Sequence, residues 1–366
     1  MKGYYVVALA FAFACTTDTA IGPDVALDSL FIQPDSAAIV LGDTLRLTAV
    51  GVDSAGRRFV ETRVTWSTSD PAVTLAPNGV VVGAAVGSAS VRANAGTKTA
   101  TAVVTVTPQP IFATSRDSVP FTGIASGPYP AAQTVTITNA GGGTLTPAVD
   151  SIRYGAGATG WLQASIATGG PDTLRLTATT AGLAVNSYSA SVFLGAPKAS
   201  PKTIKVTLAV TVGAAATMAI DSGDAQTATV NTAVPVKPTV RIRDQYGNPV
   251  PSVAVTFFVA LGGGTALPAL PVSTDATGRA RATSWTLGTA AGPNRLDASA
   301  SGLTTVSFAA TGSPGAPAAA TKTAGDTQAV TVNTAVPVQP TLRVTDQFGN
   351  PVESVTVTFN VALGGG

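Results

Sequence analysis

The residue types that carry most enzymatic chemistry are scarce in this chain of 366 residues, which contains no histidine and one cysteine, Cys15. Without histidine, the chain cannot form a Ser-His-Asp or Cys-His nucleophile system or an imidazole metal ligand. A single cysteine excludes an internal disulfide framework, a cysteine-rich zinc site and C-x-x-C redox chemistry. We therefore expect a protein that is not an enzyme and that holds no cofactor and no metal.

The carboxylates are spread along the chain, without the close pair that glycoside hydrolysis needs or the Asp-x-Asp-x-Asp run of a calcium loop. Two glycine triplets, at 141–143 and 262–264, lack the Lys-Ser/Thr of a phosphate loop, and we interpret them as flexible loops. We assign no catalytic residue. An aspartate at the first position of a turn accepts backbone N–H bonds, and this role accounts for most of the following residues: Asp53, Asp70, Asp172, Asp244, Asp275 and Asp346.

The single cysteine follows a segment that is typical of an export signal. Lys2 supplies a positive charge, and residues 3–13 form an apolar run of 11 residues. A membrane-spanning helix needs about 20 such residues, so the run fits the core of a signal peptide instead. We expect residues 1–14 to be a signal peptide and residues 15–24 to be a polar tether.

Two processing routes remain open at Cys15. The segment Ala12-Phe13-Ala14-Cys15 resembles a bacterial lipobox, which implies acylation of Cys15. Thr16 rather than aspartate follows the cysteine, and the resemblance then implies an outer-membrane lipoprotein at the cell surface. In the alternative, Ala12-x-Ala14 is a signal-peptidase site, and the mature protein is freely secreted.

The rest of the chain has the composition of short strands joined by many turns. Charged residues make up 11%, beside 38 glycines and 25 prolines. Apolar and polar residues alternate in segments such as 44–49, 134–138, 204–210 and 239–243, which is the period of a half-buried strand. Asn78-Gly79 predicts a hairpin. The sequence therefore predicts an all-β fold of tandem antiparallel immunoglobulin-like β-sandwiches.

An internal repeat indicates how these strands are grouped. Residues 223–264 align without gaps on residues 325–366, at an offset of 102, and 31 of the 42 positions are identical. The second copy stops at Gly366, where the first continues to residue 312. Half a sandwich cannot close its core, so we expect the chain to be a piece of a longer protein. A natural stub is the alternative.

We predict four modules, which resemble three known bacterial immunoglobulin-like families. Residues 25–108, with VTWSTSD around Trp66, resemble the Ig-like group 2 domain. Residues 110–211, with TVTITNAGGGTL and TIKVTLAV, resemble BACON-type Ig-like domains, which implies glycan or mucin binding beside carbohydrate-active enzymes. Residues 214–312, with DQYGNPVPSVAVTF and AGPNRLDASA, resemble the Ig-like group 1 domain of invasin- and intimin-type adhesins, and residues 317–366 resemble an incomplete second copy.

Each complete module carries one tryptophan, and a large aromatic side chain in a sandwich most simply anchors the core. We therefore expect core positions for Trp66, Trp161 and Trp285. Three tyrosines are candidates for stacking on sugar rings, although a structural use is the first interpretation: Tyr129, Tyr154 and Tyr188.

Charge and module order together define the expected function. The formal net charge is +2, from 21 basic and 19 acidic residues, so no strong field attracts nucleic acid. Short linkers, at 107–113, 211–217 and 311–321, favour a rod over a cluster. We expect a non-enzymatic bacterial cell-surface protein, either a lipid-anchored adhesin or a structural stalk. Its partner would be an unknown surface protein or glycan, and only the lipid anchor would contact a membrane. The alternative is an accessory region of a larger secreted carbohydrate-active enzyme, with a glycan-binding or spacer role.

Overall fold

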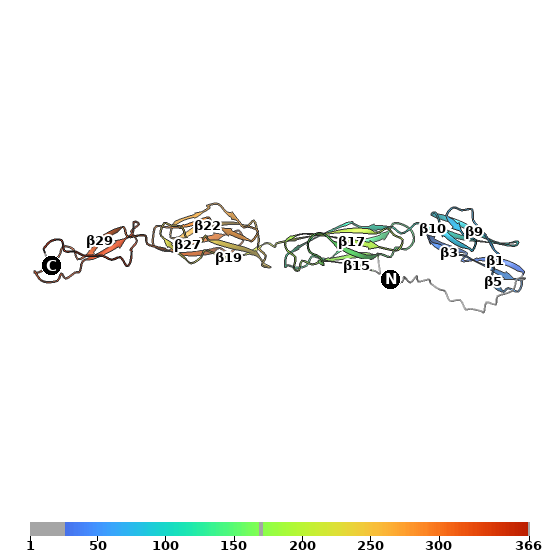
Figure 1. The fold of residues 1–366 in the computed structure, drawn as a ribbon, viewed down its shortest axis with the longest axis horizontal. Helices are drawn as coiled ribbons and strands as arrows, with labels where there is room; N and C mark the ends of the chain where they lie inside the picture. Colours follow the sequence, from blue (N-terminus) through green and yellow to red (C-terminus); the bar gives the residue numbers. More distant parts are fainter. Residues whose placement is uncertain (1–25, 168–170, 365–366) are drawn as a thin grey trace.

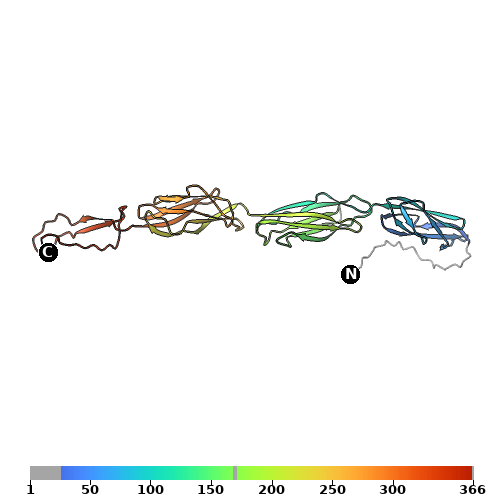
Figure 2. The same ribbon diagram turned by 45° about the horizontal axis from the view of Figure 1, so that its top comes forward.

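The computed structural model describes residues 26–167 and 171–364, and every regular element in these ranges is a β-strand. The predicted signal peptide, the tether and Cys15 lie outside the described residues. The strands form successive bodies that follow one another end to end, and both views show one long rod in sequence order (Figures 1 and 2). Within the described ranges, no helix is long and apolar enough to cross a membrane. The protein is thus a tandem array of all-β immunoglobulin-like domains.

The first module places three sheets around a core that includes Leu47, Val81, Val91 and Val104. Its pairing orders are β1-β4-β5, β3-β8-β7 and β2-β10-β9-β6. The strands are β1 (Leu27–Gln33), β2 (Ser36–Val40), β3 (Thr44–Arg46), β4 (Thr48–Asp53), β5 (Arg58–Val60), β6 (Thr65–Ser67), β7 (Val73–Leu75), β8 (Val80–Gly83), β9 (Gly87–Ala95) and β10 (Lys98–Thr107). Asn78-Gly79 lies in the β7–β8 hairpin, as the sequence predicted.

The second module is a sandwich of two four-stranded sheets, ordered β11-β13-β16-β15 and β12-β18-β17-β14. Alternating side chains such as Ile204, Val206 and Leu208 face its core and are fully buried, whereas Lys205 between them is exposed. The strands are β11 (Phe112–Thr114), β12 (Ser118–Ile124), β13 (Gln133–Asn139), β14 (Ala148–Tyr154), β15 (Leu162–Ala167), β16 (Thr173–Ala178), β17 (Asn186–Gly195) and β18 (Lys202–Thr211).

The third module contains sheets ordered β19-β21-β25, β20-β28-β27-β22-β24 and β23-β26. Its core includes Ile242, Phe257, Trp285 and Phe308. The strands are β19 (Ala215–Ser222), β20 (Gln226–Thr229), β21 (Thr239–Asp244), β22 (Ala254–Leu261), β23 (Gly264–Leu267), β24 (Val272–Ser273), β25 (Arg279–Arg281), β26 (Ser284–Leu287), β27 (Gly292–Ser299) and β28 (Val306–Ser313).

The fourth segment repeats only the beginning of the third module and forms one strand pair, β29 (Ala319–Ala324) with β30 (Thr341–Thr345). Val230 and Phe257 of the third module are 2% and 3% exposed, whereas their counterparts Val332 and Phe359 are 90% and 58% exposed. In the third module, strands at 272–313 complete the pairing of β20, β21 and β22, and residues 317–364 contain no equivalent of these later strands. A segment that shares 31 of 42 positions with the third module therefore leaves its apolar face open where the later strands are lacking.

Each of the three sandwiches departs from a wholly antiparallel arrangement at the same place. Its first strand lies at the edge of one sheet, and the next strand crosses over to run parallel to the last strand of the module. The parallel pairs are β2 with β10, β12 with β18, and β20 with β28. In each module, the crossing strand pairs with part of the last strand, whose edge would otherwise be unpaired.

The glycine triplets have a steric role that the sequence interpretation did not include. A Cβ atom on Gly141 would lie 2.1 Å from the Gln109 carbonyl oxygen, and one on Gly264 would lie 2.1 Å from the Thr286 carbonyl oxygen. Both distances are far below van der Waals contact, so glycine is needed because another backbone segment approaches closely. The first triplet packs against the linker between the first and second modules.

Candidate functional site: module junctions and an open groove

The predicted tryptophans lie inside the sandwiches or at their edge. Trp161 and Trp285 are fully buried, and Trp66 is half-buried against the first core. The Tyr154 and Trp161 rings meet edge to face, with centroids 5.9 Å apart. Tyr154 donates its hydroxyl hydrogen to the Leu162 carbonyl, and the buried Tyr188 donates to that of Ala184. Among the candidate tyrosines, only Tyr129 has an exposed ring in the described part of the chain.

The turn aspartates form a repeated local hydrogen-bonding motif. In four turns of the described residues, an Asp-x-x-Gly-x sequence places glycine at a positive φ of 74° to 84°. One carboxylate oxygen accepts the N–H groups of the second and fourth following residues at 2.8 to 3.0 Å. The aspartate N–H donates in return to the carbonyl of the fourth residue. These turns begin at Asp53, Asp244, Asp275 and Asp346.

Two of these turns lie at module junctions. At the second junction, the Asp244 Oδ2 atom accepts the Gly213 N–H of the linker at 2.8 Å and the Asn248 Nδ2 hydrogen at 2.8 Å. Asn248 Nδ2 also donates to the Ala125 carbonyl of the preceding module at 2.7 Å. The turn at 244–248 is therefore hydrogen-bonded within itself, to the linker and to the neighbouring module.

The third junction repeats this arrangement 102 residues later. Asp346 Oδ2 accepts the Gly315 N–H at 2.9 Å and the Asn350 Nδ2 hydrogen at 2.8 Å. Asn350 Nδ2 donates to the Thr289 carbonyl, and its Oδ1 accepts the Ala291 N–H, both at 2.8 Å. The Asn350 amide thus bonds to the preceding loop in the manner of an adjacent strand.

Hydrogen bonding dominates the charge state of the junction carboxylates. Burial alone would raise the pKa of Asp346, but the hydrogen bonds from Asn350, Gly315 and Phe348 outweigh it and lower the pKa to about 2. The same balance, with burial opposed by bonds from Asn248, Gly213 and Tyr246, lowers the pKa of Asp244. Both carboxylates are therefore charged near neutral pH and act as strong acceptors.

The first junction uses different side chains. Asn139 Oδ1 accepts the Ile111 N–H at 3.0 Å, and its Nδ2 donates to the carbonyls of Gly142 and Gly143. This asparagine folds the glycine-rich loop over the linker. Lys198 of the second module forms an ion pair with Asp43 of the first.

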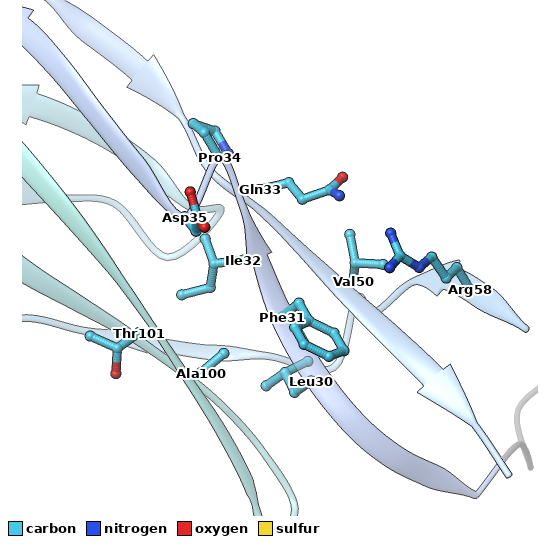
Figure 3. Close-up of a pocket in the computed structure, with 10 residues that line it drawn as sticks. All are labelled: Leu30, Phe31, Ile32, Gln33, Pro34, Asp35, Val50, Arg58, Ala100 and Thr101. Atoms are coloured by element: carbon cyan, nitrogen blue, oxygen red, sulfur yellow. The ribbon is translucent and has the colours of Figure 1, made fainter. Parts of the chain in front are cut away.

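An open groove of about 650 Å³ lies on the first module, beside the crossing from β1 to β2. In Figure 3, strand β1 lies between the segment carrying Ala100 and Thr101 on one side and Val50 and Arg58 on the other. The Phe31 side chain is 48% exposed. The remaining lining residues are Leu30, Ile32, Gln33, Pro34 and Asp35.

Two unpaired strand edges border this groove. β1 pairs only with β4 among the described strands, and β2 covers β10 only from Val103 onwards. The Val103 N–H points towards β2 and bonds to the Asp35 carbonyl. The Thr101 N–H points the same way, because every second residue of a strand faces the same neighbour. The groove can therefore accept an extended chain by β-strand addition.

The sequence interpretation missed the junction asparagines and the groove. Asn248 and Asn350 lie at matching positions of the repeat, but nothing in a single sequence shows that a turn faces another module. The Asp-Asn spacing, present in both copies and absent from the other turns of this type, was the available signal. No group of three or more His, Cys, Asp or Glu side chains that could hold a metal ion occurs within 26–167 and 171–364.

Comparison with known proteins gives matches to solved structures only. No family model matches the chain, and no curated protein matches it. It is similar to the titin I-band fragment I67-I69, at 11% identity over 80% of this chain and 98% of that one, with a TM-score of 0.37. It is similar to mouse cadherin-23 EC22-24, at 15% identity over 77% and 98%, with a TM-score of 0.37. It is also similar to domains 4 and 5 of the S-layer protein SbsC, at 21% identity over 51% and 99%, with a TM-score of 0.30.

Proposed function

We propose that this protein is a non-enzymatic, extracytoplasmic stalk of a bacterial cell surface, in which tandem immunoglobulin-like modules hold a binding element away from the membrane. The observation that carries the proposal is the hydrogen-bonded junction. Each linker is short, and at the second and third junctions one turn bonds to both the linker amide and the neighbouring module. A stalk needs junctions of fixed geometry, because freely hinged modules would fold back on one another.

The sequence features at the N-terminus supply the surface location in this proposal. A signal peptide at 1–14 exports the chain, and acylation of Cys15 anchors it in the outer membrane. The resemblance of residues 214–312 to invasin- and intimin-type repeats supports a role in adhesion, whereas the BACON-like residues 110–211 support a glycan as the contacted surface. Many weak contacts on one stalk would then add through high effective concentration.

The test of this location is intact mass spectrometry with membrane fractionation, in a diderm bacterium that expresses the full chain. We expect a diacylglyceryl or triacylated mass on Cys15 and recovery of the protein in the membrane fraction. Cys15→Ser should release the protein from that fraction, while Thr16→Ser, which leaves the cysteine in place, should not. An unmodified mature chain in the soluble fraction of the wild type would contradict the anchored stalk.

The groove on the first module favours a second function, the capture of an extended polypeptide by strand addition. The probe is a peptide selected from a displayed library against the full chain. Thr101→Pro removes the N–H that points into the groove without removing a bond to β9, and Phe31→Ala removes the exposed ring. Both variants should weaken binding of the selected peptides by about ten-fold, which corresponds to about 1.4 kcal/mol. Selected peptides that bind both variants as tightly as the wild type would exclude the groove.

A further inference from the structure

We propose that the Asp-x-x-Gly-Asn turn is a general module coupler, which binds the main chain of whichever module precedes it, and that the fifth residue of the turn decides between coupling and exposure to solvent. The inference rests on the proposed stalk function and names the device that makes the stalk stiff. It follows from a comparison that the chain itself offers, because the same turn occurs four times in two different settings.

The four turns share their geometry and differ in their fifth residue. Where that residue is arginine, at Arg57 and Arg279, no hydrogen bond joins the turn to another module in the described structure, and the arginine side chain is exposed. Where it is asparagine, at Asn248 and Asn350, the turn lies at a junction and bonds to the module before it. The backbone bonds within the turn are the same in both classes. The turns that couple modules therefore differ from those that do not in the side chain at the fifth position.

The two couplers dock on unrelated loops. Asn248 bonds to the Ala125 carbonyl, just after β12 of a BACON-like module, whereas Asn350 bonds to Thr289 and Ala291, just before β27 of a group 1-like module. The sequences around these contacts are IASGP and GTAAG. In both loops, the atoms contacted by the asparagine belong to the backbone. A turn that bonds only to main-chain atoms can couple to preceding modules of different sequence, and the modules of this chain resemble different families.

Asparagine suits this role for a chemical reason. Its short amide carries both a donor and an acceptor, so it can bond to a carbonyl and an N–H of one loop. The aspartate Oδ2 atom holds the same Nδ2 group at 2.8 Å in both couplers, which fixes the direction of the amide. Arginine has no acceptor and a long side chain, and at Arg57 it turns back to pair with Asp53 at 2.7 Å.

The test measures the distance distribution across the second junction by double electron–electron resonance. The full chain carries Cys15→Ser, with spin labels at Thr207→Cys of β18 and Ala309→Cys of β28, both exposed positions. We expect one narrow distribution in this background. Asn248→Arg and Asn248→Ala should each make it about twice as wide, because the linker then moves as a short flexible chain. Asn78→Ala, which alters an exposed turn of the first module, is the matched control and should change nothing.

A second experiment tests whether coupling by the turn depends on which module precedes it. A second copy of residues 213–314 is inserted after Pro314, so that the inserted Asn248 meets the Thr289 loop of an identical module. We expect the new junction to be as narrow as the native one, and Asn248→Arg in the inserted copy to widen it. A wide distribution at the new junction with wild-type asparagine would overturn the general coupler.

The outcomes separate this inference from the stalk proposal. A narrow wild-type distribution that stays narrow in both Asn248 variants would refute the coupler and leave the stiff stalk intact. A wide wild-type distribution would refute the stiff stalk itself. Unchanged amide spectra of the third-module core in each variant establish that the substitution has not unfolded the module.

Discussion

At the scale of single residues, the junction carboxylates serve structure through their hydrogen bonds. Asp346 accepts three backbone N–H groups, one from the linker at Gly315 and two from its own turn, and its pKa falls to about 2 from an ordinary value of 3.8. A folded-state pKa below the unfolded value means that the charged form stabilises the fold. This contribution is complete above about pH 4 and is lost as the pH falls through about 2.

The matching experiment is a pH titration of the Phe348 and Asn350 amide chemical shifts. We expect both to report one transition with a midpoint near 2, because both amides donate to Asp346. Asp346→Asn should abolish this transition. A midpoint near 4 for both amides would show that the hydrogen bonds do not hold the carboxylate in its charged form.

The buried tryptophans make a second prediction at this scale. Trp285 is fully buried, and its indole N–H has no hydrogen-bond partner in the described structure. Trp285→Ala should lower the free energy of unfolding by about 3–5 kcal/mol, as for other large buried aromatic residues. Trp285→Phe should cost less, because it also removes the unsatisfied donor. Urea denaturation measures both, with Tyr129→Ala as an exposed control, and equal costs for alanine and phenylalanine would contradict this account.

At the scale of elements, glycine decides how closely the loops approach one another. Gly141→Ala would place a Cβ atom against the Gln109 carbonyl, so the loop at 139–143 must move away from the linker. We expect a loss of about 1–3 kcal/mol, the usual cost of overpacking. Gly182→Ala meets no atom within 4 Å and should cost about 1–2 kcal/mol through its positive φ alone. Thermal unfolding with hydrogen exchange at Ile111 distinguishes them, since only Gly141→Ala should expose that amide.

The elements also show what sequence reasoning reaches and what it misses. Period-two alternation predicted strands such as 204–210 and 239–243, because a half-buried strand imposes that pattern on its own residues. The turn role of Asp244 followed from local chemistry in the same way. The contact between Asn248 and Ala125 could not be predicted, because it joins residues 123 positions apart across two modules. The close backbone approach at the glycine triplets could not be predicted for the same reason, since the atoms that exclude a side chain belong to distant segments.

At the scale of the whole molecule, the modules form one long rod, and residues 317–364 leave half a sandwich open. The fourth segment exposes Val332 and Phe359, whose counterparts are buried in the third module. Strands with the pattern of β25 to β28 would cover this face, and exposed apolar strands without them favour association. We expect concentration-dependent self-association of the full chain. Replacing Val332 and Phe359 with serine should reduce it, as measured by sedimentation velocity. An equally associated variant would place the cause elsewhere.

Small-angle X-ray scattering of the full chain carrying Cys15→Ser shows directly whether the modules form a stiff rod in solution. A compact protein of this length has a radius of gyration of about 21 Å, and the stiff stalk predicts a much larger value with the cross-sectional scattering of a rod. The double variant Asn248→Arg, Asn350→Arg should lose the rod signature and show a shorter average extension. A wild-type curve that fits a compact particle, or an ensemble of freely jointed modules, would contradict the account.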